Sequence, residues 1–409
     1  MSVQREAIQR RTLRVLITAQ VLSGAGLAAG VTVGALLAED VLGTTRLSGV
    51  PAALLTLGSA GAAYLVGSLS DRRGRRSGLA AGYAAGAVGG AGVALGAILD
   101  SPVLLLVSLL IYGAGTATSL QARYAGADLA LPTRRGAAVS TILVATTLGA
   151  VAGPNLVAPL GRLAERHDLP ALSGPFMLAA VAYAMAAVVL LLLLRPDPLL
   201  AARTFAQELA DSGQPSQDRT SVTDHAAVRL GGTTMVVTQL VMVAVMTMTP
   251  IHMRDHGHGL GATGLVIGLH VAAMFLPSPV TGRLVDRYGT TPVATAGGAS
   301  LLASGLLAAL SPPHSVPLLA VALILLGLGW NLGLLAGTTL VSGAVPLVGR
   351  ARVQGRLDVA VALAGATGGL SSGVVVAGTS YRVLALTSGI LAMLVLAAAL
   401  RPARPVLTE

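Results

Sequence analysis

The chain reads GSLSDRRGRR at residues 67–76, directly after one apolar run, and GRLVDRYG at residues 282–289, directly after another. The acidic residues of these two loops, Asp71 and Asp286, lie 215 residues apart. A single G-x-L-x-D-R loop would be weak evidence for any organisation of the chain. Its repetition at the same place in each half indicates two equivalent halves of about six apolar segments each, an organisation typical of secondary transporters.

The composition indicates a membrane protein. Hydrophobic residues make up 54% of the 409 residues, and charged residues only 11%, whereas a soluble domain carries about 25% charged residues. The apolar runs are about 20 residues long, which suffices to cross a hydrocarbon core about 30 Å thick. They do not show the alternation of β-barrel strands. Because backbone groups in lipid must be bonded internally, the sequence predicts an all-α membrane protein.

Twelve runs are long enough to span a bilayer, and a polar stretch separates the first six from the last six. We expect an N-terminal bundle at 1–194, a cytoplasmic linker at 195–229 and a C-terminal bundle at 230–409. Within the linker, residues 198–211 could form an amphipathic helix on the membrane surface or a solvated tether. The expected spans are 14–38, 47–69, 77–98, 102–125, 136–158, 174–194, 230–250, 261–281, 291–310, 316–342, 355–378 and 382–400.

The positive charges predict the orientation of the chain. Lysine is absent, so all 27 positive charges are Arg. With the N-terminus inside, most of them fall on the cytoplasmic side, as the positive-inside rule requires. The exceptions are Arg46, Arg162, Arg166, Arg254 and Arg382. We therefore expect a multi-pass protein of the cytoplasmic (inner) membrane with both termini in the cytoplasm.

The missing residue types narrow the chemistry. The chain has no Cys, which excludes disulfides and thiolate metal sites. Without lysine it has no Walker A lysine, so transport energy should come from an ion or solute gradient. We expect a monomer that is not an enzyme and that needs neither a cofactor nor nucleic acid.

Paired glycines support the duplication. Gly113 and Gly115 correspond to Gly327 and Gly329 at an offset of 214 residues, close to the offset of the two Asp loops. Glycines allow close approach of helix backbones. A second pair, Gly149 and Gly153, corresponds to Gly365 and Gly369 at an offset of 216.

With these features the chain resembles the major facilitator superfamily over nearly its whole length. Residues 67–76 match the signature loop between spans two and three, and residues 282–289 match its degenerate second copy. The resemblance implies two six-helix repeats around a midplane cavity, with the loop residues bracing a cytoplasmic gate. The alternative is a simple topogenic charge cluster. The residues to which the resemblance gives a gating role are Asp71, Arg72, Gly74, Arg75, Arg76, Asp286 and Arg287.

A candidate metal site lies in spans seven and eight, which contain MVAVM at 242–246 and HVAAM at 270–274. Residues four apart share a helix face, so Met242 and Met246 should face the same way, as should His270 and Met274. Met242 and His270 are both expected about 12–14 Å below the outer helix ends, where they could meet. Thioether and imidazole ligands without carboxylate suit Cu(I). In the loop between the spans, His252, His256 and His258 could collect the metal.

The same two motifs resemble major facilitator copper importers that serve cytochrome oxidase assembly. Similar relatives carry other cargo, including riboflavin. Met242 and Met246 could instead be ordinary core residues, and a lone His can bond a backbone carbonyl. His270 could also carry a proton or bind the solute without metal. Further candidates for solute contact are Asn155, Gln239 and Asn331, each of which could instead form an interhelical hydrogen bond.

A drug-exporter signature is present in part. Residues 149–154, GAVAGP, resemble the span-five signature of proton-driven drug exporters. No glycine pair follows Pro154, and residues 103–110 lack the Arg that those exporters tend to carry. The sequence thus favours a secondary carrier for copper uptake. Proton-coupled efflux of drugs or metabolites and riboflavin-like uptake remain as alternatives.

Overall fold

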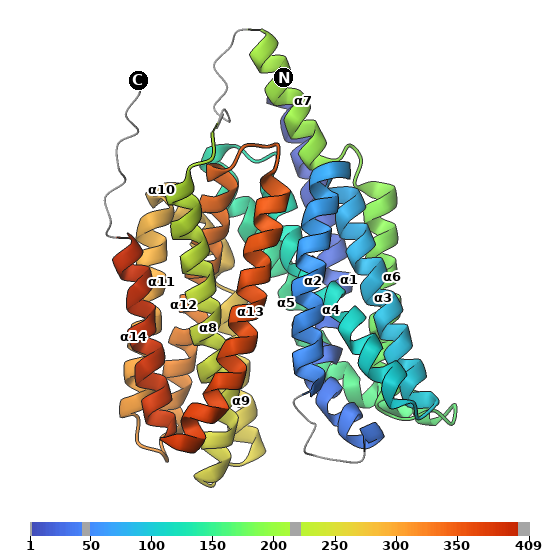
Figure 1. The fold of residues 1–409 in the computed structure, drawn as a ribbon, viewed down its shortest axis with the longest axis vertical. Helices are drawn as coiled ribbons and strands as arrows, with labels where there is room; N and C mark the ends of the chain where they lie inside the picture. Colours follow the sequence, from blue (N-terminus) through green and yellow to red (C-terminus); the bar gives the residue numbers. More distant parts are fainter. Residues whose placement is uncertain (1, 43–49, 213–221, 400–409) are drawn as a thin grey trace. The chain divides into compact units, whose positions relative to one another are not determined.

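The computed structural model describes residues 2–42, 50–212 and 222–399, except for the side chains of 25–42, of 148–155 and of a few single positions. Every regular element among these residues is helical (Figure 1). The helices are α1 (Ser2–Leu42), α2 (Val50–Arg73), α3 (Arg75–Ile98), α4 (Pro102–Ala127), α5 (Arg135–Glu165), α6 (Ser173–Leu193), α7 (Pro198–Asp211), α8 (His225–Asp255), α9 (Leu260–Phe275), α10 (Ser278–Tyr288), α11 (Thr290–Leu310), α12 (Val316–Ala344), α13 (Arg350–Gly378) and α14 (Tyr381–Ala399), with a 3-10 turn at Pro132–Arg134.

Ten helical segments of the described chain are long and apolar enough to cross a membrane. This agrees with the predicted all-helical membrane protein. The two other predicted spans, 14–38 and 136–158, fall on α1 and α5, where many side chains lie outside the described residues. The count of twelve and the duplication therefore stay predictions.

The predicted span 261–281 lies within the membrane-span candidate Gly261–Tyr288, but two helices form it instead of one. α9 ends at Phe275, and α10 begins at Ser278 and continues to Tyr288. Pro277 lies at the break. Proline lacks an N–H and its ring clashes with the preceding turn, so it interrupts a helix interior.

Close packing divides the chain into two compact units. Unit 1 contains Met1–Leu131, Thr141–Arg219 and Leu347–Leu363, and unit 2 contains Pro132–Ser140, Thr220–Pro346 and Ala364–Glu409. The start of α5 thus belongs to unit 2, and the first half of α13 belongs to unit 1.

Aromatic rings lie at the centre of unit 1. The ring centroids of Tyr83 and Tyr183 are 5.7 Å apart, and Tyr112 packs on Tyr183 at 5.5 Å and on Phe176 at 5.4 Å. The hydroxyl of Tyr83 donates a hydrogen bond to Gln20 on α1. This core joins α1, α3, α4 and α6, and the buried hydroxyl of Tyr83 has the partner that such a group usually needs.

Helices α3 and α4 approach each other closely through glycine. A Cβ atom added to Gly86 would lie 2.8 Å from the Cα of Gly115 and 3.2 Å from the ring of Tyr183. Small residues at such crossings allow helix backbones to touch, which is a main source of helix association in lipid. The paired glycines of α4 noted in the sequence thus have a packing role at Gly115.

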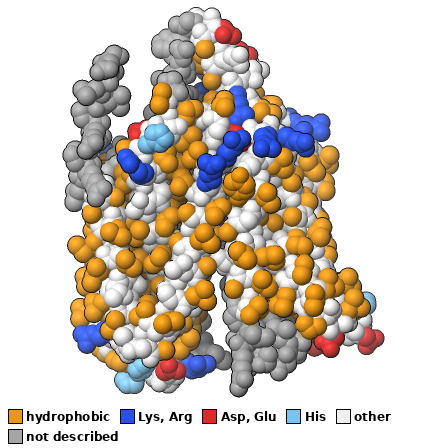
Figure 2. Space-filling view, viewed as in Figure 1, with side chains coloured by type: hydrophobic (Ala, Val, Ile, Leu, Met, Phe, Trp, Pro, Cys, Tyr) orange, Lys and Arg blue, Asp and Glu red, His pale blue; other side chains and the backbone are white. Residues whose placement is uncertain are grey.

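The surface agrees with a membrane setting. On the face drawn in Figure 2, hydrophobic side chains cover the long sides of the helices, whereas charged side chains gather near the helix ends. Large apolar residues such as Val88, Leu192 and Leu394 are exposed. In lipid this exposure carries no hydrophobic penalty.

Replacement of Gly86 by Ala should destabilise unit 1, because the added methyl forces the α3 and α4 backbones apart at a cost of about 1–3 kcal/mol. The matched control is Gly61→Ala on α2, where an added Cβ meets nothing within 4 Å. Thermal unfolding in detergent, followed by size-exclusion chromatography of heated samples, should show a lower midpoint for Gly86→Ala only. Equal midpoints for the two variants would contradict the tight crossing.

Candidate functional site

The first Asp loop is a sharp turn between α2 and α3. Gly74 lies between the two helices with φ of 89°, in the left-handed region that glycine adopts without strain. An added Cβ at this position would also overlap the carboxylate of Asp197. Glycine is therefore needed both for the backbone conformation and for the close approach of Asp197.

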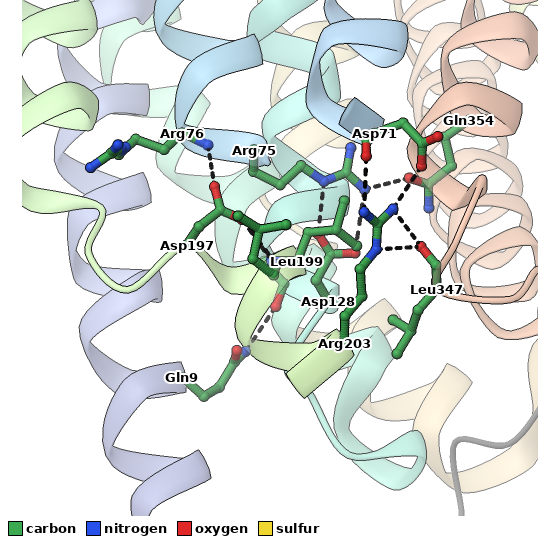
Figure 3. A network of polar contacts seen from close by, with 12 residues as sticks. Gln9, Asp71, Arg75, Arg76, Asp128, Asp197, Leu199, Arg203, Leu347 and Gln354 are labelled. Carbon is green, nitrogen blue, oxygen red and sulfur yellow. Dashed lines mark hydrogen bonds and ion pairs between the residues drawn. The ribbon is translucent and has the colours of Figure 1, made fainter. Parts of the chain in front are cut away.

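Asp71 lies at the end of α2 and has several partners (Figure 3). Its Oδ1 accepts hydrogen bonds from Arg203 Nη2 at 2.8 Å and from the backbone N–H of Gly349 at 2.9 Å. Arg352 Nη2 lies 3.6 Å from Oδ2. The side chain is only 8% exposed. Because Gly349 directly precedes α13, Asp71 places a negative charge at the N-terminus of that helix, where the helix dipole favours it.

The second Asp loop makes an equivalent contact in unit 2. The two carboxylate oxygens of Asp286 accept hydrogen bonds from the backbone N–H groups of Gly136 at 2.7 Å and Ala137 at 2.9 Å. These residues form the first turn of α5. Asp286 thus supplies acceptors for N–H groups that have no partner inside the helix. Each Asp loop therefore caps a helix that is distant in the sequence.

Arg75 forms a buried ion pair at the start of α3. Its Nε lies 2.7 Å from Asp128 Oδ2, and the two side chains are 0% and 1% exposed. Nη2 donates to Asp128 Oδ1 at 3.3 Å and also to the side-chain oxygen of Gln354 on α13. Such a pair is strongly unfavourable to break, since a lone buried charge remains when one partner leaves.

Arg123 forms a second buried ion pair. Its Nη2 lies 2.7 Å from Asp358 Oδ1 on α13, with both side chains at most 7% exposed. Tyr124 connects to the same carboxylate through its hydroxyl at 3.2 Å. The Arg123 guanidinium also lies over the Tyr124 ring at 4.3 Å. A cation over a tyrosine face in a desolvated site is further stabilised by the ring.

The other predicted gate residues differ in their surroundings. Arg76 donates its backbone N–H to Asp197 at 2.7 Å. Arg72 is exposed, and Arg287 is exposed with its guanidinium 5.2 Å from the ring of Tyr288. Of the predicted set, Asp71, Arg75 and Asp286 bond groups that are distant in the sequence, and their gating role stays a prediction.

Sequence reasoning missed several members of these networks, namely Asp128, Asp197, Arg203, Gln354 and Asp358. One signal was available. Arg123 lies inside an apolar span, and a cation there requires a carboxylate partner. In a chain with only 17 acidic residues, few candidates exist.

In unit 2, one face of α12 holds α9. His270 is fully buried, and its Nδ1–H donates to the carbonyl of Leu323 at 2.8 Å. Its Nε2 is buried without a hydrogen-bond partner. One helical turn further along α12, Gly327 allows the backbone of His270 to pack closely. The imidazole is therefore held with one nitrogen available as an acceptor.

Asn331 forms hydrogen bonds with residues on both sides of the break between α9 and α10. Its amide donates to the carbonyl of Met274 and to the hydroxyl of Ser278, both at 2.7 Å, and its oxygen accepts from Thr281 at 2.6 Å. Pro277 cannot continue the helix, so the last carbonyls of α9 need such partners. In this structure the polar groups of Asn331 are bonded to protein.

Gln239 and Trp330 form a polar and aromatic pair between α8 and α12. The indole N–H of Trp330 donates to Gln239 Oε1 at 2.8 Å. Phe275 packs edge-on against Trp330 with ring centroids 5.5 Å apart. Trp330 is 4% exposed, whereas Gln239 and Phe275 are partly exposed. Trp330 is also the only tryptophan of the chain.

The predicted methionine ligands lie on separate helices. α9 packs chiefly against α12 and only sparsely against α8. Met242 on α8 and Met274 on α9 are buried, and Met246 is partly exposed. Their convergence with His270 on a single ion stays a prediction. Asn155, the remaining predicted contact, is in α5 at a position whose side chain lies outside the described residues.

The loop histidines gather near the end of α8. The ring centroids of His252 and His256 are 4.4 Å apart, and His314, which the sequence did not single out, lies 6.1 Å from His256 and 6.4 Å from His258. His256 and His258 bond backbone carbonyls. Within the described chain, no group of three or more His, Cys, Asp or Glu residues could hold a metal ion.

The fold is shared with solved transporters of organic solutes. The human organic anion transporter MFSD10 matches with a TM-score of 0.74 at 20% identity, covering 96% of this chain and 99% of that one. The proton:xylose symporter XylE matches with a TM-score of 0.75 at 17% identity, covering 97% and 95%.

Curated relatives match over most of the sequence. The uncharacterized MFS-type transporter YdeG of Bacillus subtilis is 54% identical over 96% of this chain and 92% of its own length. The riboflavin transporter RfnT of Brucella anthropi is 29% identical over 85% of each chain.

The family model described as Major Facilitator Superfamily matches residues 16–230 and 230–409. Together with the helical fold and the capped Asp loops, this match establishes that the chain is a multi-pass membrane protein belonging to the major facilitator superfamily of transporters.

Proposed function

We propose that this protein is a secondary carrier that takes up a small organic solute with a planar heteroaromatic ring across the cytoplasmic membrane. The proposed class of solute is based on the pair formed by Gln239 and Trp330, with Phe275 beside it. Aromatic faces and edges pack well against a flat conjugated ring. The amide of Gln239 adds a group that can hydrogen-bond a ring heteroatom.

The relatives support an organic solute. RfnT is named as a riboflavin transporter, and riboflavin contains a planar ring system. Uptake is favoured over export because the chain lacks two features of drug exporters, the glycine pair after Pro154 and an Arg within residues 103–110. His270 supplies a buried acceptor nitrogen that could take a proton or bond the solute during transport.

The networks at the two Asp loops serve as the cytoplasmic gate in this proposal. They lie at the Arg-rich helix ends, which the positive-inside rule assigns to the cytoplasm together with both termini. Asp71 and the Arg123–Asp358 pair hold the first turns of α13. Opening of the gate must separate these groups and expose them to water, because a buried charge that loses its partner costs about 3–5 kcal/mol. We therefore expect the contacts to be either fully formed or fully separated and solvated.

Copper uptake is the second candidate, and His270 favours it. An imidazole whose N–H is fixed by a backbone carbonyl presents its other nitrogen as a metal ligand. His270 has this arrangement through Leu323. Met242 and Met274 would supply the soft donors that Cu(I) prefers.

The first test uses Trp330 as a probe, because no other tryptophan contributes to the emission. Titration of the purified protein with riboflavin should quench the fluorescence saturably, whereas xylose should not. Gln239→Leu should weaken riboflavin binding about tenfold through loss of a hydrogen bond to the ring. Gln4→Leu, at an exposed position of α1, is the control. Absence of quenching by riboflavin and by other flat heterocycles would contradict the proposed solute class.

The second test concerns the gate. Asp71→Asn removes the charge that faces α13 and keeps the side-chain shape, so transport into proteoliposomes should fall about tenfold or more. Solute binding measured by Trp330 fluorescence should persist. Arg73→Ala, an exposed neighbour on α2, should transport normally. Full transport by Asp71→Asn would exclude a gating role for this loop.

The third test separates copper from organic solutes. If copper is the cargo, His270→Ala and Met242→Ala should each lower cellular copper, measured by mass spectrometry, while His167→Ala in an exposed turn should not. Membrane insertion is checked by immunoblot of the membrane fraction. Unchanged copper content in a deletion strain would remove this candidate.

A further inference from the structure

The polar stretch after α6 forms an ordered helix with a buried apolar face. Asp197 caps α7 by accepting from the backbone N–H groups of Leu199 at 3.0 Å and Leu200 at 3.2 Å. The same carboxylate accepts from Arg76 at the start of α3. This shared cap fixes the start of α7 to the first Asp loop.

The apolar face of α7 is covered by protein. Leu199, Ala202 and Phe205 are at most 9% exposed. Ala202 and Phe205 pack with Leu129, which follows α4, and Leu347 packs against the same cluster. The face that an amphipathic helix would present to lipid is therefore occupied. The helix expected over 198–211 is present as α7, and its apolar face packs on protein.

Arg203 of α7 connects two segments that are distant in the sequence. Its Nη1 and Nη2 donate to the backbone carbonyl and the Oδ1 of Asp71, at 2.9 and 2.8 Å. Its Nε and Nη2 donate to the carbonyl of Leu347, at 3.1 and 2.9 Å. The planar guanidinium can make this set of bonds, whereas a lysine ammonium cannot reproduce its geometry. Leu347 lies three residues before α13.

Arg203 is also the main neutralising group for Asp71. The second cation, Arg352, is more distant at 3.6 Å and its side chain is 42% exposed, against 22% for Arg203. Interactions of exposed charges are weakened by solvent. Without Arg203, Asp71 would keep the N–H of Gly349 but lose its closest counter-charge.

From these contacts we infer that α7 is a working part of the gate, with Arg203 as a positioning residue that holds Asp71 against the segment leading into α13. The inference rests on the proposed gating role of Asp71. Opening must break the Arg203 bonds to Asp71 or to Leu347, so α7 takes part in each transport cycle. We call the contact among Arg203, Asp71 and Leu347 the latch.

The experiment exploits the absence of cysteine from the chain. Ala351 in the first turn of α13 is fully buried, and an added Cβ at Gly67 of α2 would lie 2.8 Å from its carbonyl. In an Ala351→Cys background, a maleimide reagent can react when this turn leaves α2. The labelling rate in the full-length protein in proteoliposomes therefore reports release of α13, independently of transport.

Arg203→Ala should raise the labelling rate about tenfold, and Arg203→Lys should raise it less, because the ammonium replaces only part of the bonds. Asp71→Asn should raise it similarly. The double variant should label no faster than the faster single variant, since both residues belong to one contact. Gln207→Ala, exposed on the same helix, is the matched control and should label like the parent protein.

The outcomes distinguish the inference from the proposed gate. Parental labelling and transport in both Arg203 variants, with rapid labelling in Asp71→Asn, would overturn the latch and leave the gate intact. Parental labelling and transport in Asp71→Asn would overturn the gate itself. If Arg203→Ala does not fold, as judged by size-exclusion chromatography, the comparison uses Arg203→Lys and the charge exchange Asp71→Arg with Arg203→Asp. Slower labelling in the exchange than in either of its single variants would support the latch.

Discussion

A buried charge must have a partner, and this constraint organises the end of unit 1 that contains the first Asp loop. Arg75 and Arg123 lie in the protein interior, where an unpaired cation would cost several kcal/mol, about 3–5 if a partner is simply removed. Their carboxylates come from Asp128 and Asp358. Because Asp358 belongs to α13, satisfying Arg123 draws the first half of that helix into the same compact unit.

The same constraint connects structure with transport. Just before α13, the backbone N–H of Gly349 donates a hydrogen bond to Asp71. Arg203 donates to the carbonyl of Leu347, two residues earlier. These bonds are strong when water is excluded and weak once it enters, because the dielectric constant around them rises. A contact of this kind favours two discrete arrangements over a continuum. That property suits a carrier that must close one side before it opens the other.

In unit 2 the helix break at Pro277 plays the organising role. A helix interrupted within an apolar environment leaves carbonyl groups that need donors. Asn331 provides them from α12, and on the same face of α12 the carbonyl of Leu323 fixes His270. Discontinuous helices in transporters are frequently found beside the solute or ion site. The proximity of Trp330 and Phe275 to this break agrees with the proposed solute position.

The sequence alone determined the class of protein and the approximate positions of most helices, and it singled out Asp71, Arg75 and Asp286 as gate candidates. These follow from apolar length and from a repeated motif, both of which are local properties. Only the tertiary structure decided the partners. Arg203 could not be recognised as the counter-charge of Asp71, because the two are separated by 132 positions in the sequence and no local pattern indicates their contact. The sequence also could not predict that α9 packs on α12. Helical periodicity defines the apolar face of a helix but not the neighbour that covers it.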